Sequence, residues 1–183
     1  MDRRFIRGEK SKAAMKAAFL ELFRTTEPED ITVIELCKKA GVHRSTFYAH
    51  YEYMEQLIQE VLLDSVAKAC EGFTLQWDMP LEDGGVKRSI IRSYLRRFLS
   101  DPTLLRFCTC ANSSQYRRLI IRAQVEVSLG PVKDPVRYFA AYYHNAGAFN
   151  CVLEWLNNGE PIPEDDVIEI IHQASKIMYR SWT

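Results

Sequence analysis

Apolar side chains recur at intervals of three and four residues along nearly the whole of this 183-residue chain. Met15, Phe19, Leu22 and Phe23, for example, place one apolar stripe on a helix expected over roughly residues 9 to 25. No segment shows the sustained alternation of apolar and polar residues that a half-buried strand requires. The chain is therefore expected to be all-α, with about nine helices.

The clearest local signals surround a glycine-containing turn. Thr32 followed by Glu35 has the spacing of a capping box, which satisfies two backbone N–H groups at the start of a helix. Gly41 stands where the left-handed residue that ends a helix is wanted, and Phe47 can anchor the following helix, with His43 as its N-cap. Two short helices joined in this way, after a first helix that supplies a core, are typical of a helix-turn-helix DNA-binding unit.

The other helices are marked mainly by their apolar period and by prolines and glycines. A fourth helix is expected to end at about Cys70. The segment 73–85 contains Pro80, Gly84 and Gly85 and has no helical period, so it is predicted to be a loop and the boundary between two parts. Further helices are expected over residues 86–99, 102–110 and 113–129, from the Asp134 cap to Gly159, and from Pro163 onward.

Charge is distributed unevenly over a chain whose formal net charge is zero. Residues 1–50 carry ten Lys and Arg against seven Asp and Glu, and most of the excess lies in the first sixteen residues, "MDRRFIRGEKSKAAMK". A basic arm on a neutral protein suits a polyanionic partner, although a solvated, frayed terminus would have the same composition. No secretory signal and no apolar run of about 20 residues is visible, so a cytoplasmic protein without a membrane partner is expected.

The cysteines do not indicate a disulfide framework. The five cysteines are an odd number at scattered spacings, which suits a reducing compartment. Cys108 and Cys110 could form a redox pair, but on a helix adjacent-but-one side chains diverge by about 200°. No nucleophile elbow, metal-binding histidine pair or phosphate-binding glycine loop is present, so neither enzymatic activity nor a cofactor or metal ion is expected.

Residues 10–62 resemble the DNA-binding domain of the tetracycline-repressor (TetR) family of transcriptional regulators. The resemblance rests on "ITVIELCKKAGVHRSTFYAHYEYMEQLI", where a capping box, a turn glycine and "RSTFYAHY" occur in register. In the second half, "NAGAFNCVLEWLNNG" is similar to the penultimate helix of many members. The resemblance implies a DNA-binding domain over residues 1–52 and an effector-binding and dimerisation domain over residues 53–183, linked by the fourth helix.

The family's mode of action is implied with the fold. A homodimer would place two recognition helices in successive major grooves of a palindromic operator, most often as a repressor, and a small-molecule effector would change its affinity. Arg44 and Ser45 would contact bases, with Arg44 a bidentate partner of guanine. The expected phosphate contacts are Thr46, Tyr48, His50, Lys10 and Lys12. Tyr53 and Met54 stand where members usually carry a small capping residue and a lysine, which predicts weaker DNA binding than is typical.

Two further sites are expected in the second half. Aromatic side chains between helices could line an apolar effector pocket: Tyr94, Phe98, Phe107, Tyr116, Tyr138 and Tyr142. The last two helices carry apolar faces that could form a four-helix dimer interface: Phe149, Val152, Leu153, Leu156, Ile170, Ile171, Ala174 and Ile177. Burial of both sets within a single chain is the simpler alternative. At the level of function, the alternatives are a TetR-like adaptor with weakened DNA binding and a small thiol-dependent redox protein.

Overall fold

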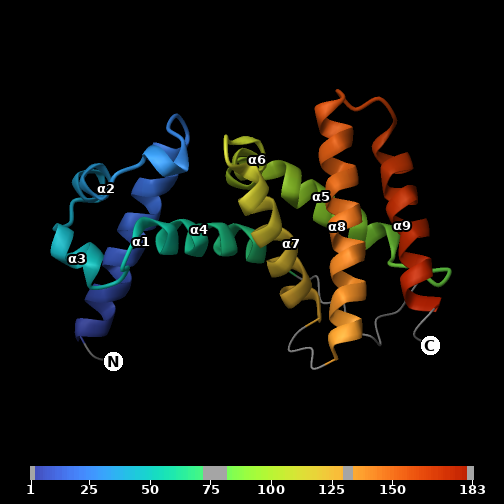
Figure 1. Ribbon diagram of the computed structural model, residues 1–183, viewed down its shortest axis with the longest axis horizontal. Helices are drawn as coiled ribbons and strands as arrows, with labels where there is room; N and C mark the ends of the chain where they lie inside the picture. Colours follow the sequence, from blue (N-terminus) through green and yellow to red (C-terminus); the bar gives the residue numbers. More distant parts are fainter. Residues whose placement is uncertain (1–2, 72–81, 130–133, 181–183) are drawn as a thin grey trace.

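The computed structural model describes the backbone of residues 3–71, 82–129 and 134–180, and the side chains of residues 8–71, 82–127 and 134–176. These residues form an elongated, all-helical molecule without a strand, so the expected fold class is confirmed (Figure 1). The elements are α1 (Arg3–Phe23), the short 3-10 helix η1 (Pro28–Asp30), α2 (Val33–Ala40), α3 (Arg44–Tyr48), α4 (Met54–Ala69), α5 (Arg88–Ser100), α6 (Pro102–Thr109), α7 (Ser113–Leu129), α8 (Pro135–Asn157) and α9 (Glu164–Arg180).

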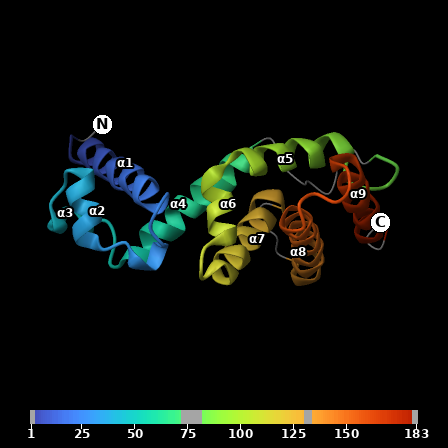
Figure 2. The ribbon, with the colours of Figure 1, turned by 90° about the horizontal axis from the view of Figure 1, so that it is seen from above.

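Helices α1, α2 and α3 form a group at one end of the molecule, and α5 to α9 form a larger group at the other (Figures 1 and 2). Helix α1 begins at Arg3, earlier than the expected residue 9, so the basic arm continues the helix instead of fraying. Gly8 lets α1 lie close to His50, because a Cβ atom there would lie only 3.3 Å from the His50 ring. The helix thus passes close to the segment that follows α3.

Helix α4 joins the two groups. Its buried face, which includes Leu57, Val61 and Val66, packs on α1 at one end and on α6 and α7 at the other (Figure 1). One buried apolar cluster therefore runs without a break from Met15 in α1 to Phe149 in α8. A movement of α4 at either end must be accommodated by both groups, because well-packed cores do not deform continuously.

In the larger group, α7, α8 and α9 pack successively side by side, and α5 crosses this row (Figure 2). A second buried cluster between α5, α8 and α9 contains Leu95, Trp155 and Ile168. Asp134 caps α8 as expected, by accepting from the Val136 N–H group at 2.9 Å. None of the helices in the described part of the chain has the length and apolarity needed to cross a lipid bilayer.

A tight turn precedes α5. Asp83 and Gly84 both have positive φ, and Glu82 and Gly85 form a bridge on either side, as in a two-residue hairpin turn. Most of the loop expected over residues 73–85 lies outside the described residues, which resume at residue 82. The next residue, Val86, is fixed on α9 by two hydrogen bonds, described below with the cavity that it lines.

Candidate nucleic-acid interface and cavity

Hydrogen bonds fix both ends of α2, the helix that precedes the turn into α3. The Glu35 N–H donates to the Thr32 hydroxyl at 3.2 Å, and the Thr32 N–H donates to the Glu35 carboxylate at 3.1 Å, which completes the predicted capping box. At the other end Gly41 has φ 65° and ψ 32°. Its N–H donates to Lys38 O, and the Val42 N–H donates to Cys37 O at 3.1 Å. This pair of bonds is a Schellman motif, so the angle at which α3 leaves α2 is set by the backbone.

Helix α3 is anchored by one side chain and exposes the others. Phe47 is fully buried, and its ring centroid lies 5.3 Å from that of Tyr48 and 5.6 Å from that of Tyr51. Arg44, Ser45 and Tyr48 are exposed, and Thr46 is half-buried. Because α3 lies at the outer end of the smaller group, this exposed face is open to a large partner (Figure 1).

The remaining expected phosphate contacts are arranged differently. His50 is half-buried against α1 at Gly8. Lys10 is exposed, whereas the Nζ atom of Lys12 lies 2.8 Å from Glu60 and 5.6 Å from the centroid of the Tyr51 ring. Lys12 therefore takes part in an ionic contact between α1 and α4, and a phosphate would have to compete with Glu60 for it.

Helix α4 begins without a side-chain cap, and a side-chain bond lies just before it. Tyr53 is the N-cap residue and its side chain makes no capping bond, as the departure from the family pattern suggests. The carboxamide of Gln56 instead accepts from the Glu52 N–H group at 2.7 Å. The bond reaches the residue before the N-cap, so it stabilises the turn into α4 and differs from a capping box, in which the third helical residue accepts from the N-cap N–H group. Met54 packs against the main core.

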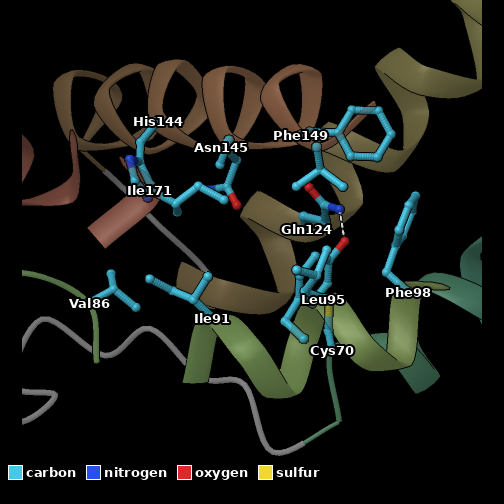
Figure 3. Close-up of a pocket in the computed structure, with 13 residues that line it drawn as sticks. Cys70, Val86, Ile91, Leu95, Phe98, Gln124, His144, Asn145, Phe149 and Ile171 are labelled. Carbon is cyan, nitrogen blue, oxygen red and sulfur yellow. Dashed lines mark hydrogen bonds between the residues drawn. The ribbon is translucent and has the colours of Figure 1, made fainter. Parts of the chain in front are cut away.

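A cavity lies between α5, α7, α8 and α9, and Cys70 at the end of α4 forms part of its wall (Figure 3). Two of the six aromatic residues expected in a pocket, Tyr94 and Phe98, line it. The other lining residues were not anticipated: Cys70, Val86, Ile91, Leu95, Gln124, His144, Asn145, Ala148, Phe149, Val152 and Ile171. The available sequence signal was a pair of polar residues, His144 and Asn145, in an otherwise apolar stretch.

Val86 is fixed in the cavity wall by polar groups of α9. Its N–H donates to the Ser175 hydroxyl at 2.8 Å, and its carbonyl lies 2.8 Å from Nδ1 of His172. Gly85 permits this approach, because a Cβ atom there would lie 2.7 Å from the Ser175 hydroxyl and 2.8 Å from the His172 carbonyl. The position of Val86 in the cavity wall therefore depends on the residues of α9 as much as on the turn before α5.

The other four expected pocket residues lie elsewhere. Tyr138 and Tyr142 stack on each other along α8, with ring centroids 6.4 Å apart. Phe107 and Tyr116 are buried in the main core, where Phe107 lies 4.4 Å from the Phe23 ring of α1. Tyr116 donates to Glu29 at 2.9 Å. Phe107 and Tyr116 thus connect the larger group of helices to the helix-turn-helix unit.

Arg106 of α6 strengthens this connection. Its guanidinium donates to the carbonyl of Phe23, the last residue of α1, and at 3.2 Å to the carbonyl of Thr26 in the turn that follows. It also lies over the Phe23 ring, 5.1 Å from the centroid. Carbonyl groups at a helix C-terminus have no partner within the helix, so Arg106 acts as a C-cap supplied by the other group.

The residues expected in a dimer interface are divided between the interior and the surface. Phe149, Val152, Leu153 and Ile171 are buried within the single chain, and Leu156 is half-buried. Ile170 and Ala174 are exposed, and the side chain of Ile177 lies outside the described residues. A different apolar stripe on α8 is exposed: Val136, Phe139 (68%) and Tyr143 (84%).

The thiol groups lie in apolar surroundings. Burial raises the pKa of the Cys70 thiol to about 11 and that of Cys108 to about 12, and it also raises the pKa of Cys110. These thiols stay protonated near neutral pH, which disfavours nucleophilic or redox chemistry. Within the described residues, no three His, Cys, Asp or Glu side chains are grouped as metal ligands.

Comparison with known proteins gives a fold and a short sequence match. No family model matches the chain. YxbF, an uncharacterized HTH-type transcriptional regulator of Bacillus subtilis (strain 168), is 32% identical over 78 residues, which are 41% of this chain. The match spans about a fifth of the length of that relative, 19%. The crystal structure of a TetR transcriptional regulator from Rhodococcus sp. RHA1 superposes with a TM-score of 0.57 and 17% identity, over 96% of this chain and 98% of that chain. The chain therefore has the TetR fold, as the sequence resemblance implied.

Proposed function

We propose that this protein is a TetR-family transcriptional regulator that binds a palindromic DNA operator as a homodimer, represses transcription there, and is modulated by a small-molecule effector. The carrying observation is the exposed face of α3, with Arg44, Ser45 and Tyr48 presented on a helix whose direction is fixed by Gly41 and Phe47. A rigidly oriented short helix with a polar outer face is what insertion into a major groove requires.

The side chains on α3 have complementary roles in this proposal. Arg44 at the start of the helix can reach a base edge, and a bidentate contact with guanine contributes about 1–3 kcal/mol of discrimination. Tyr48 and Thr46 can bind phosphate oxygens, which positions the helix without reading sequence. The α1 residue Lys10 adds attraction that depends on salt.

Dimerisation is supported by the exposed apolar residues of the last two helices. Val136, Phe139 and Tyr143 recur every three or four residues on α8, and Ile170 of α9 is 49% exposed. Contiguous exposed apolar side chains are typical of an interaction surface. We infer that this stripe, and not the buried Phe149 and Val152, forms most of the contact between two copies.

An effector role for the cavity is supported by its position at the end of α4. Cys70 lines it directly after the last residue of α4, and the first residue of the same helix is six positions after Tyr48 of α3. A molecule bound in the cavity that displaced the end of α4 would change the orientation of α3. Coupling of this kind requires the bound molecule to have different affinities for the two conformations of the protein, which differ in the orientation of α3.

Fluorescence anisotropy with labelled duplexes from around the coding region tests DNA binding. We expect affinity to fall steeply with salt, and Arg44→Ala with Tyr48→Ala to weaken binding at least tenfold. Arg96→Ala is the matched control, because it removes the same charge from an exposed position on α5. Salt-independent binding, or equal losses in the α3 variant and the control, would contradict the proposal.

The second candidate keeps the fold without DNA binding, as an adaptor for another protein or a ligand. It is favoured by the exposed Glu52 and Tyr53 beside α3, where an acidic group repels phosphate. A dimer that binds no duplex even at low salt would support the adaptor. If repulsion by the acidic group is the cause, Glu52→Gln should then restore measurable duplex binding at low salt.

A further inference from the structure

The cavity between α5, α7, α8 and α9 is lined by side chains without a formal charge. Its polar lining consists of Tyr94, Gln124, His144 and Asn145, and the rest is apolar (Figure 3). Among the residues that the structure describes, no Asp, Glu, Lys or Arg belongs to this lining. An ion entering the cavity would lose its hydration without gaining a counter-charge, which is strongly unfavourable.

The histidine does not change this balance near neutral pH. Burial lowers the pKa of His144 to about 4, so its imidazole is neutral at pH 7. A neutral imidazole provides one N–H donor and one acceptor nitrogen. The cavity thus offers hydrogen bonds but no net charge to an occupant.

The amide side chains are oriented by bonds to neighbouring groups. Nδ2 of Asn145 donates to the Ala141 carbonyl at 2.8 Å, and the Asn145 oxygen is directed toward the cavity (Figure 3). Nε2 of Gln124 donates to the Tyr94 hydroxyl. Asn145 therefore presents an acceptor whose direction is already set, which lowers the entropic cost of binding a donor.

The size of the cavity limits its occupant. The volume is about 60 Å³. Because an apolar cavity of about 150 Å³ holds one benzene molecule, this space accommodates about two or three non-hydrogen atoms as it stands, and a molecule of five or six displaces some of the lining side chains.

We propose that the cavity binds a small, uncharged, mainly apolar organic molecule with one hydrogen-bonding group, held by the Asn145 carboxamide and the His144 imidazole. The apolar part of this molecule lies against Leu95, Phe149 and Val152. That it acts as an effector rests on the proposed function, whereas its binding and its exclusion of ions rest on the cavity alone.

Butyramide and butyrate test the proposal, because they have the same shape and differ by one charge. Each is titrated into the full chain at pH 7.5 without DNA, and the methyl signals of Ile91, Val152 and Ile171 are followed by NMR. Butyramide should give saturable shifts with a Kd in the millimolar range, because a ligand of six non-hydrogen atoms makes few contacts. Butyrate should bind at least tenfold more weakly. The same contrast is expected between 1-butanol and butylammonium.

Two asparagines of α8 provide a matched pair of variants. Asn145 and Asn150 both donate to the carbonyl four residues earlier at 2.8 Å, but only Asn145 lines the cavity. Asn145→Leu should weaken butyramide binding at least fivefold, and Asn150→Leu should leave it unchanged. Circular dichroism confirms that each variant is folded.

Equal affinity for butyramide and butyrate would overturn the proposal, as would the absence of saturable shifts in the folded protein. Equal responses of the two asparagine variants would do the same. Anisotropy on the same sample separates this outcome from the proposed function. DNA binding that depends on Arg44, without probe binding, rejects the cavity proposal alone. Probe binding without DNA binding rejects the regulator proposal alone.

Discussion

Gly41 adopts φ 65°, a left-handed conformation in which a Cβ atom crowds the following carbonyl. Apart from Gly41 itself and its two chain neighbours, no atom lies within 4 Å of the position that a Cβ would occupy, so glycine is required here for its backbone freedom and not for space. The bonds from Gly41 and Val42 back to α2 fix the angle of α3, and the exposed Arg44 follows three residues later.

Gly41→Ala is therefore expected to lower the free energy of unfolding by about 1–2 kcal/mol, the cost of a left-handed non-glycine residue. Gly41→Asn is the control, since asparagine tolerates this conformation better, and it should lose about half as much. Urea unfolding followed by circular dichroism measures both values. If alanine and asparagine cost the same, the conformational explanation for Gly41 is wrong.

At the scale of elements, α1 and α4 are joined by a group of charged side chains. Nζ of Lys16 lies 2.7 Å from both Glu60 and Asp64, and Lys12 lies 2.8 Å from Glu60. Partial burial would raise the pKa of Glu60, but hydrogen bonds from Lys12 and Lys16 outweigh it and lower the pKa to about 2. The native state thus favours the ionised carboxylate. This contact maintains the orientation of the helix-turn-helix unit relative to the linking helix.

The lowered pKa predicts an acid-sensitive contribution to stability. Because the folded pKa of about 2 is below the ordinary value of 4.5, the contribution is complete above pH 4.5 and is lost as the pH falls toward 2. With the Glu60 side chain 31% exposed, solvent screening reduces it to about 1–2 kcal/mol. Glu60→Gln should remove this amount at pH 7 and flatten the pH dependence, whereas Glu55→Gln on the exposed face of α4 should change neither. Urea unfolding at pH 7, 4.5 and 3 gives the comparison, and an equal acid response in the two variants would contradict it.

At the scale of the whole molecule, the sequence predicted what local chemistry determines. The capping box at Thr32, the Gly41 turn and the Asp134 cap involve residues a few positions apart, so short patterns identify them. The cavity joins side chains from four helices, and only Tyr94 and Phe98 were anticipated, because no short pattern records which helix faces meet. Arg106 was overlooked for the same reason, since its partner carbonyls are about 80 residues away.

The proposed dimer is a property of two complete chains, so it is tested on the whole protein. Phe139→Glu with Tyr143→Glu places two charges on the exposed apolar stripe of α8, where burial against a second copy would be strongly unfavourable. Light scattering should then report a monomer of 21.2 kDa in place of a dimer. Ile34→Glu is the matched control, because Ile34 is 61% exposed on α2, away from α8.

DNA binding should weaken together with the dimer, although no residue of α3 is changed. Two recognition helices on one rigid dimer bind their half-sites in a single event, whereas a monomer must bind each half-site separately. The affinity of the α8 variant for a palindromic duplex should therefore fall at least a hundredfold, and its affinity for a single half-site should stay the same. A wild-type protein that is already monomeric, or a variant that remains dimeric, would remove this stripe from the interface. Loss of affinity for the half-site as well would indicate that the substitutions disturb α3 itself, since monomer formation alone leaves that contact intact.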